Sequence, residues 1–425
     1  MTDCPHEGLF ATPDPDLVRC PYPVYAHLRS EHPVHWVEAL SAYAVTRHAD
    51  VLDALLRPED FSSTRQSGPG AATALARAAA ADETYPDAVR AAAVRRVGIA
   101  EKGASLVNCD PPRHGQQRTL MNKAFAPRRV AALESAIADL AQSLLNGFVD
   151  AGRADLVRQY AVPLPMTVIA RALGIDDVDQ ATLKRWSDCF VRANGKPTLP
   201  REEIVALLIG LDECYDYFTA AMADRMVAPR EDLISDVAAA GDVLRHEEQL
   251  QTLTLFLIGG NETTQSLISS CAAALAIDPA LQERLRRQPS ELPAFVEEVL
   301  RLEPPAQGLF RTATRDTSVG GVPIAEGQFI WLLYAAANRD PEQFPTPDDL
   351  LLDRGAEGRR HLSFAQGPHF CLGAPLARAE ARIAIEVLLR RTRSLRLASR
   401  EDLGAWMPNL VQHNLTRLQV EFEPS

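Results

Sequence analysis

One cysteine lies in a segment whose glycines and prolines leave the backbone few conformations. Residues 364–375 read FAQGPHFCLGAP, so Cys371 stands directly before a stretch that predicts a helix over 374–391. Gly367 and Gly373 permit tight turns and close backbone approach. The free N–H groups at the start of such a helix point toward the cysteine and favour its thiolate. A cysteine beside a glycine turn is usually a buried structural residue, but this spacing favours a loop that presents a thiolate to a metal.

Apolar residues recur every three or four positions along most of the chain, which is typical of amphipathic helices. The clearest stripe predicts a helix that Gly152 ends, and it consists of Leu133, Ile137, Leu140, Leu144 and Phe148. Further helical patterns cover 201–227, 245–277, 279–302 and 374–391. Residues 63–105 are rich in alanine and lack clear caps, which predicts a mobile loop that contains short helices.

Strand patterns are short and local. They predict strands at 42–46, 395–397 and 418–422, and a hairpin at 319–334 interrupted by Pro323 and Gly327. The chain shows no internal repeat and no stretch that resembles an interdomain linker. We therefore expect a single domain that is mainly α with small β-sheets.

Charge and cysteine content exclude several classes of protein. The 425 residues include 44 basic and 56 acidic ones, a net charge of −12 at pH 7, so general binding to nucleic acid is not expected. The seven cysteines form no CxxC pair, which argues against a zinc ribbon or a disulfide framework and fits a reducing compartment. We see no signal peptide and no run of roughly 18 apolar residues that could span a membrane. A cytoplasmic protein without a membrane segment is expected.

Several common catalytic motifs are missing from the sequence. It contains no GxxxxGK[ST] phosphate loop, no GxGxxG, no GxSxG and no HExxH. The cysteine segment is the candidate that remains, and its pattern FxxGxHxCxG resembles the haem-binding loop of the cytochrome P450 family, the haem-thiolate monooxygenases.

The resemblance continues along nearly the whole chain, and the motifs follow the family's order. The matching segments are 21–63 (N-terminal helix and hairpin), 110–125 (the helix across the haem), 259–264 (GGNETT, the oxygen-activating motif), 298–301 (EVLR, the ExxR motif) and 338–341. The resemblance implies a cytochrome P450 fold over residues 21–425, after an N-terminal extension at residues 1–20.

By this resemblance Cys371 is the iron ligand of haem b, and a thiolate in that place favours O–O cleavage. The two haem propionates need cations, which the resemblance assigns to His114, Arg118, Arg311 and His369. It also implies cofactor contacts from Gly260, Phe364 and Gly373.

The ExxR pair is implied to be structural. The pairs Glu283/Arg286 and Glu357/Arg360 have the same spacing, and such pairs on helices are usually solvated. Glu298 and Arg301 are preferred because an apolar stretch precedes them and two prolines follow. In the family this pair locks the core around the haem loop.

Oxygen activation needs protons delivered to a dry site. Glu262 and Thr263 form an acid–alcohol pair in an otherwise apolar helix, which suits a proton relay and a hydroxyl near bound oxygen. The neighbouring glycines, Gly259 and Gly260, would permit a locally opened helical turn. The sequence departs modestly from the family pattern, with Glu262 for a common Asp, Gly259 for Ala, Ala365 for Gly and Gln116 for Arg.

The resemblance also implies the substrate site and the partners. Candidate lining residues are Leu255, Ile258, Gly259, Gln307 and Leu309, with the regions 63–107, 180–215 and 409–412. Because this lining is largely apolar, a small hydrophobic organic substrate is expected.

The chain carries no flavin or iron–sulfur domain, so electrons from NAD(P)H would arrive through a ferredoxin-type donor. A basic cluster before the haem loop would dock that donor, and it comprises Arg354, Arg359, Arg360 and His361, joined by Arg113 and Lys123. The alternatives are a non-catalytic haem-thiolate binding protein and a peroxide-driven relative, and the presence of Glu262 and Thr263 argues against both.

Overall fold

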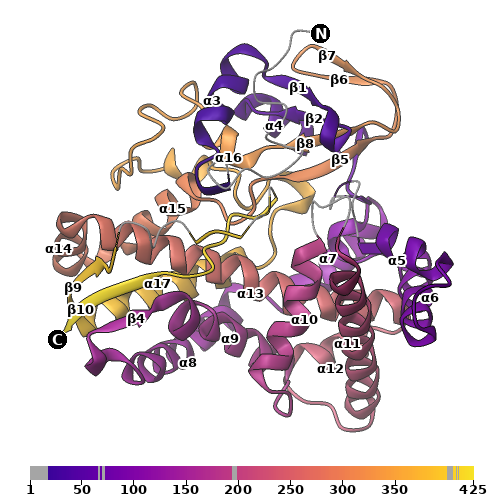
Figure 1. Cartoon of the computed structure of the whole chain (residues 1–425), viewed down its shortest axis with the longest axis horizontal. Coiled ribbons are helices and arrows are strands. Elements are labelled where there is room, and N and C mark those ends of the chain that lie inside the picture. Colours follow the sequence, from indigo (N-terminus) through magenta and orange to yellow (C-terminus); the bar gives the residue numbers. More distant parts are fainter. Residues whose placement is uncertain are drawn as a thin grey trace.

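The structure is a computed structural model that describes residues 18–65, 68, 72–193, 199–399, 405–407, 409 and 411–425. Two of the small sheets, together with α3 (Tyr22–Glu31), α4 (His48–Leu55) and α16 (Tyr334–Ala337), lie at the top of Figure 1. Helices make up most of the rest, with a third small sheet at the lower left. The predicted class, mainly α with small β-sheets, is confirmed. Most of the predicted extension, residues 1–17, lies outside the described residues.

One long helix, α13 (His246–Ile277), runs through the middle of the molecule and packs against α6, α9, α10, α11, α12, α15 and α17 (Figure 1). The helices around it are α5 (Ala72–Ala81), α6 (Asp87–Lys102), α7 (Arg113–Asn122), α8 (Pro127–Asn146), α9 (Pro163–Leu173), α10 (Gln180–Ala193), α11 (Arg201–Val227), α12 (Leu233–Ala238), α14 (Pro279–Arg287), α15 (Leu292–Leu302) and α17 (Ala374–Arg391). Among the residues described, no helix is both long and apolar enough to cross a membrane.

Prolines and glycines set several helix ends. Helices α11 and α17 have the predicted bounds, and α17 carries Pro375 in its first turn, where a missing N–H costs nothing. The predicted helix at 279–302 is two helices, because Pro289 cannot continue the first. The prediction that Gly152 ends α8 is wrong, since α8 ends at Asn146 and Gly152, with φ of 65°, closes the short turn that follows.

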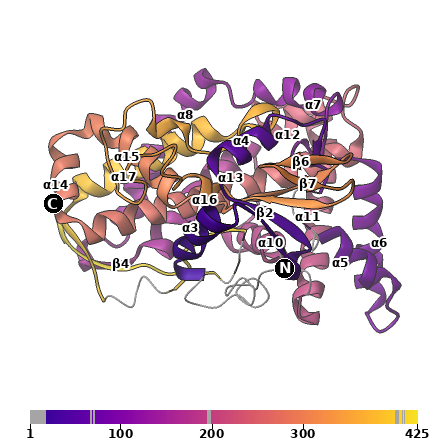
Figure 2. The ribbon, with the colours of Figure 1, turned by 90° about the horizontal axis from the view of Figure 1, so that it is seen from above.

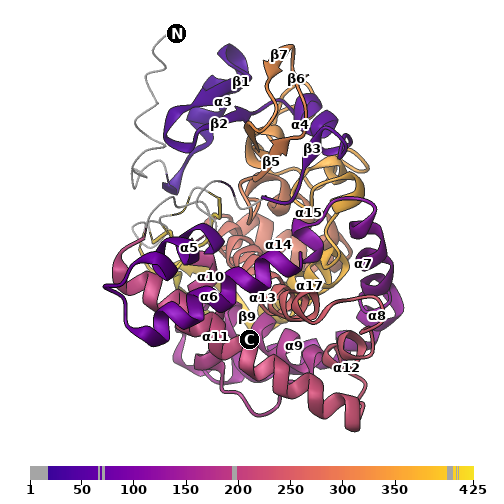
Figure 3. The same cartoon turned by 90° about the vertical axis from the view of Figure 1, so that its right-hand side faces the viewer.

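The segment 63–105, predicted as a mobile loop that contains short helices, is mainly helical where the structure describes it. Two helices, α5 and α6, form a helical pair that packs on α11 (Figure 3). Alanines on their facing sides, such as Ala76, Ala79 and Ala93, are almost completely buried against one another and against Leu208. Tertiary packing therefore holds helices for which the sequence offers no caps.

The largest sheet has the strand order β1-β2-β8-β5-β3, with β2 and β8 parallel and its other pairs antiparallel. Its strands are β1 (Val34–Val37), β2 (Ala42–Val45), β3 (Phe61–Ser62), β5 (Leu309–Ala313) and β8 (Phe329–Leu332); β4 (Arg153–Asp155), β10 (Gln419–Pro424) and β9 (Thr392–Leu397) form a second sheet. Figure 2 shows α3 and the first strands on the same side of α13 as β6 (Thr317–Val319) and β7 (Val322–Ile324).

The hairpin predicted at 319–334 is placed incorrectly. The hairpin pairs β6 (Thr317–Val319) with β7 (Val322–Ile324), and its two-residue turn is Gly320-Gly321 with both φ angles positive. The apolar strand β8 leaves β7 and enters the large sheet instead, where it is buried on both faces.

Candidate active site

Turns fix the position of Cys371 before helix α17. The N–H of Cys371 donates to the carbonyl of Phe364 at 2.8 Å, and Gly367 has a φ of 71° beside the Leu55 carbonyl. A Cβ on Gly367 would lie 2.9 Å from that carbonyl oxygen, so no other residue fits there without a shift. Ala365, at the predicted departure from glycine, also has a positive φ of 56°.

The sulfur of Cys371 faces a cavity, and its surroundings shift the pKa of the thiol in opposite directions. Burial raises the pKa of the thiol, whereas the N–H groups of Gly373 and Ala374 and the guanidinium of Arg118 lower it. Arg118 also donates to the Phe370 carbonyl at 2.6 Å, which ties α7 to the loop. The helix start alone therefore does not offset burial, and a bound cation would be needed to hold the thiolate.

Four basic side chains gather at the edge of the same cavity, namely His114, Arg118, Arg311 and His369. The rings of His114 and His369 lie 4.1 Å apart between centroids, and each has a buried Nε2 atom without a partner in the described part of the chain. Burial lowers the pKa of both rings, and the pKa of His369 falls to about 3 with help from Arg311 and His114. This cluster lacks anions and is suited to bind them.

Helix α13 forms one wall of the cavity. Its lining side includes Leu255, Gly259, Gly260 and Thr263, and other predicted residues in the lining are Leu309, Phe364 and Gly373. The helix is continuous from His246 to Ile277, so the predicted open turn is absent; the Thr263 hydroxyl donates to the Gly259 carbonyl at 2.9 Å. Two predicted lining residues, Ile258 and Gln307, are buried but do not line the cavity. Ile258 lies on another face of α13 than Leu255 and Gly259.

Glu262 does not line the cavity but is held by α10. Its side chain is 1% exposed, and Oε1 accepts from the Ser187 hydroxyl at 2.9 Å and from Lys184 Nζ at 3.2 Å. Oε2 accepts from Gln265 at 2.8 Å. Burial raises the pKa of Glu262 while Lys184 lowers it. Lys184 also pairs with Asp188, and both border a surface pocket between α10 and α11, so the carboxyl is linked to solvent.

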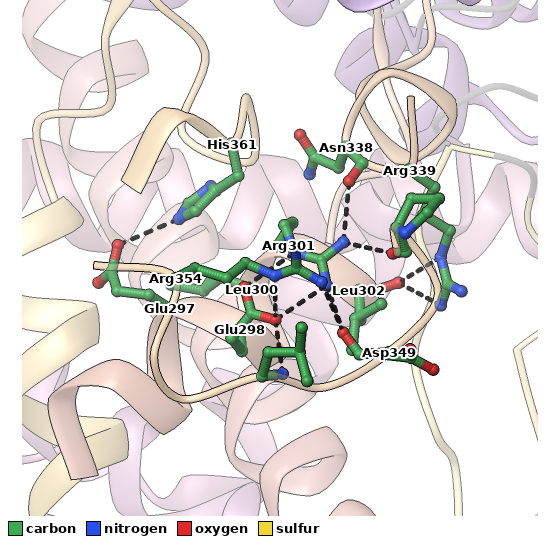
Figure 4. A network of polar contacts seen from close by, with 12 residues as sticks. Glu297, Glu298, Leu300, Arg301, Leu302, Asn338, Arg339, Asp349, Arg354 and His361 are labelled. Carbon is green, nitrogen blue, oxygen red and sulfur yellow. Dashed lines mark hydrogen bonds and ion pairs between the residues drawn. The ribbon is translucent and has the colours of Figure 1, made fainter. Parts of the chain in front are cut away.

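The ExxR pair is the centre of a buried polar network (Figure 4). Arg301 donates to both oxygens of Glu298 at 2.8 and 2.9 Å and to the carbonyls of Asn338 and Asp349. Glu298 also accepts from Arg354, at 2.9 Å. The network reaches the cysteine loop through Ser363, which donates to the Leu300 carbonyl at 2.6 Å and accepts from Asn338.

Comparisons with known proteins agree with this geometry. The family model described as Cytochrome P450 matches residues 219–403. Cytochrome P450 107B1 of Saccharopolyspora erythraea is 34% identical over 406 residues, which are 93% of each chain. The chain belongs to the cytochrome P450 family.

Solved structures of other P450s share the fold. CYP109E1 from Bacillus megaterium, in complex with testosterone, is 31% identical with a TM-score of 0.80, covering 96% of this chain and 99% of its own. P450BioI, in complex with an acyl carrier protein ligated to hexadec-9Z-enoic acid, is 30% identical with a TM-score of 0.83, covering 96% of this chain and 100% of its own.

The cavity of this P450 fits the haem that the family implies. The unpartnered Nε2 atoms of His114 and His369, beside two arginines, match the two carboxylates of a haem. Cys371 lines the same cavity, so one group could meet the sulfur and the basic cluster together. Because Cys371 brings a thiol to this cavity, it is the candidate iron ligand.

The basic cluster predicted before the cysteine loop is only half correct in this P450. Arg359 and Arg360 are exposed, but Arg354 is bound to Glu298 and His361 to Glu297, with side chains only 5% and 1% exposed. Arg113 likewise pairs with the buried Glu248. Charge alone suggested a surface position, because the sequence does not show which acidic partner a basic residue meets.

Several cavity residues of this P450 escaped the sequence analysis. They include Phe125, Ile169, Phe256, Thr264, Leu376 and Glu380. Glu380 had a detectable signal, because it is a carboxylate on the apolar face of α17, between Ala379 and Ala381. Thr264 belongs to the 259–264 motif, and the other four are apolar residues that look like ordinary core positions.

Proposed function

We propose that this P450 activates O2 to oxidise a small hydrophobic organic substrate, with electrons from a separate ferredoxin-type protein. The observation that carries the proposal is one cavity lined by Cys371, the anion-binding cluster and Thr263. When bound there, haem b would supply the oxygen chemistry through its thiolate-ligated iron.

The chain's own residues would hold the cofactor from two sides. Cys371 would bind the iron, with the N–H groups of Gly373 and Ala374 directed at its sulfur. His114, Arg118, Arg311 and His369 would bind the propionates. Changing Cys371 to Ala should abolish the thiolate-type spectrum of the reduced, CO-bound protein, whereas Cys109→Ala, at a buried cysteine outside the cavity, should keep it. Survival of that spectrum in the Cys371 variant would refute the assignment.

Glu262 and Thr263 would deliver protons. Lys184 and Asp188 connect Glu262 to the surface pocket, and Thr263 follows it in α13 on the cavity side. Thr263→Ala should leave haem content intact and divert reducing equivalents to peroxide. Thr254→Ala is the matched control, since its hydroxyl makes the same bond to a carbonyl four residues back but lies outside the cavity. Full coupling in Thr263→Ala, or unchanged turnover in Glu262→Gln, would count against the relay.

The substrate would be neutral. Among the lining residues that the structure describes, the cations are those assigned to the propionates, and the other cavity walls are mostly apolar. A carboxylate substrate would thus be buried without a counter-ion, at a cost of several kcal/mol. We expect testosterone, the ligand of the CYP109E1 complex, to shift the ferric haem spectrum more than free hexadec-9Z-enoic acid. The reverse preference would overturn the neutral class.

The donor would dock on the cysteine side, at the exposed Arg359 and Arg360. A groove there is also lined by Arg378 and Arg382, but these pair with Glu297 and Glu134. An acidic ferredoxin would therefore find positive charge on this acidic protein mainly at Arg359 and Arg360. Reversal of Arg359 and Arg360 to Glu should slow first-electron transfer and flatten its salt dependence. Reversal of Arg77 and Arg90 on α5 and α6 is the control. Equal rates in both variants would place the donor elsewhere.

We also propose that the protein works in the cytoplasm. The six described cysteines form no disulfide bond with one another, which suits a reducing compartment.

A further inference from the structure

Residues 411–413, the C-terminal strap, form one side of the cavity. Val411 and Gln412 line the cavity, whereas the third residue of the strap does not. Two backbone contacts join the strap to the stretch that follows α15. The N–H of Gln307 donates to the Val411 carbonyl at 2.7 Å, and Ala306 pairs with Gln412 in an isolated bridge. The position of the strap therefore determines part of the cavity wall.

The side chain of His413 contacts a cluster of polar groups instead of the cavity. His413 is 3% exposed, and its Nδ1 atom lies 3.2 Å from Oε2 of Glu303, which directly follows α15. The same Oε2 atom accepts from the Tyr22 hydroxyl of α3 at 2.6 Å, and Oε1 accepts from Arg339 at 3.2 Å. The other ring nitrogen of His413, Nε2, lies 3.0 Å from the Val18 carbonyl. One imidazole thus joins the strap to the end of α15 and to the segment before α3.

The cluster keeps Glu303 as a carboxylate. Burial raises the pKa of its carboxyl, but His413, Arg339 and Tyr22 together lower the pKa below its ordinary value. Aromatic contacts also hold the His413 ring, which stacks on Trp406 with centroids 3.9 Å apart and meets Tyr22 edge-on at 6.1 Å. Because Glu303 is charged near neutral pH, the strength of its contact with His413 depends on whether the imidazole carries a proton.

We propose that His413 is a positioning residue for substrate binding, and that its contact with Glu303 holds the strap in the cavity wall. This inference rests on the proposed oxidation of a neutral substrate in this cavity. His413 acts through Val411 and Gln412, since it does not itself line the cavity. A histidine loses its charge over about pH 5 to 8, so the ion pair with Glu303 becomes a weaker neutral contact as the pH rises. The strap then moves more easily, and a neutral ligand binds less tightly.

The affinity of a neutral ligand tests this role. We expect the dissociation constant of testosterone, measured from the ferric haem spectral shift of the holoprotein, to rise about fivefold between about pH 5 and 8. His413→Phe keeps an aromatic ring against Trp406 but loses the polar contacts. Its dissociation constant should equal the high-pH value of the parent and should not change with pH. A pH dependence that persists in His413→Phe would belong to His114 or His369 and would overturn the proposal.

Two tyrosine variants separate positioning from stability. Tyr22→Phe removes the hydroxyl that donates to Glu303, so it should weaken testosterone binding about threefold and keep the pH dependence, because His413 is still present. Tyr160→Phe is the matched control, since its buried hydroxyl donates to the Ala384 carbonyl of α17 at 2.8 Å and belongs to neither the strap nor its cluster. It should lower the unfolding temperature by a similar amount and leave the affinity unchanged. If Tyr160→Phe weakens binding as much as Tyr22→Phe does, the affinity follows general stability and the proposal fails.

Amide hydrogen exchange tests the strap without a substrate. At about pH 6, where an ordinary histidine is largely protonated, a peptide that covers 411–413 should exchange faster in the His413→Phe holoprotein than in the parent. Tyr160→Phe should exchange there at the parent rate. Unchanged exchange in His413→Phe would overturn the proposal even if testosterone does not bind. The thiolate-type spectrum of the reduced, CO-bound protein, recorded on the same samples, reports on the proposed function separately, and its presence would leave that function intact.

Discussion

The region around the cysteine loop (the cysteine side) and the cover formed by α5, α6 and α11 are stabilised by different kinds of ion pair. The pairs are buried on the cysteine side and exposed on the cover. On the cysteine side, Glu298 and Arg301 are buried, and each polar group is bound by several others. On the cover, Arg95 links α6 to Asp212 and Asp216 on α11, with side chains 31% to 70% exposed. Buried networks are costly to break, whereas exposed ion pairs contribute little. The difference suits a site that is fixed at the cofactor and able to open for substrate.

The largest effect is expected from breaking the buried network. Glu298→Ala leaves the guanidinium of Arg301 buried without its carboxylate, which should cost about 3–5 kcal/mol and lower haem retention. Unfolding by urea, together with the haem content of the purified protein, measures both effects. Glu283→Ala is the control, because its exposed pair with Arg287 has the same residue types. Similar losses in the two variants would remove the contrast between buried and exposed pairs.

The cysteine side should also make the free energy of unfolding depend on pH. His361 and Arg378 bind Glu297, and although burial opposes them they lower the pKa of its carboxyl from 4.5 to about 2. A depressed carboxyl pKa adds stability above the unfolded-state pKa, about 3 kcal/mol here, and this is lost as the pH falls through the folded value. The unfolding free energy should therefore decrease between about pH 5 and 2. Glu297→Gln should flatten this part of the profile, and an unchanged slope would disprove the assignment.

The sequence predicted the elements whose ends carry local signals. Helix α17 follows the glycine and proline of the cysteine segment, and α11 follows Pro200, so both have the predicted bounds. The sequence did not predict the elements whose structure or position depends on tertiary contacts. The alanines of α5 and α6 are helical because they pack on one another and on Leu208, and β8 joins the large sheet although it directly follows the β6–β7 hairpin.

The candidate site was predictable to a similar degree. The four basic residues and Cys371 converge on one cavity, as the resemblance implied. The partners of Glu262 on α10, and the burial of Arg354 and His361, involve residues 40 or more positions apart, which no local pattern reveals. Glu380 was missed because a single charged residue on a helix is usually solvated.

A smaller change in the free energy of unfolding is expected from substitutions in α13, between the two regions. A Cβ on Gly260 would lie 2.9 Å from Ile169 of α9, whereas a Cβ on Gly259 would meet only Leu255, at 4.0 Å. Gly260→Ala should destabilise the protein by about 1–2 kcal/mol through overpacking. Gly259→Ala should stabilise it by up to about 1 kcal/mol through helix propensity, while narrowing the cavity. Thermal unfolding of the two variants tests the difference, and equal shifts would mean that the packing of α9 on α13 adjusts freely.

The smallest stability change is expected on the cover itself. Arg95→Ala removes both ion pairs between α6 and α11, and exposed pairs of this kind contribute less than about 1 kcal/mol. We expect its effect to appear instead in ligand exchange, with substrate entering where α6 and α11 separate. Stopped-flow measurement of the ferric spectral shift with testosterone should show faster association and dissociation in Arg95→Ala. Added salt should speed the parent protein toward the variant, since salt screens exposed charges. If Arg95→Ala unfolds as readily as Glu298→Ala, or exchanges ligand at the parent rate, the cover is not held by these pairs.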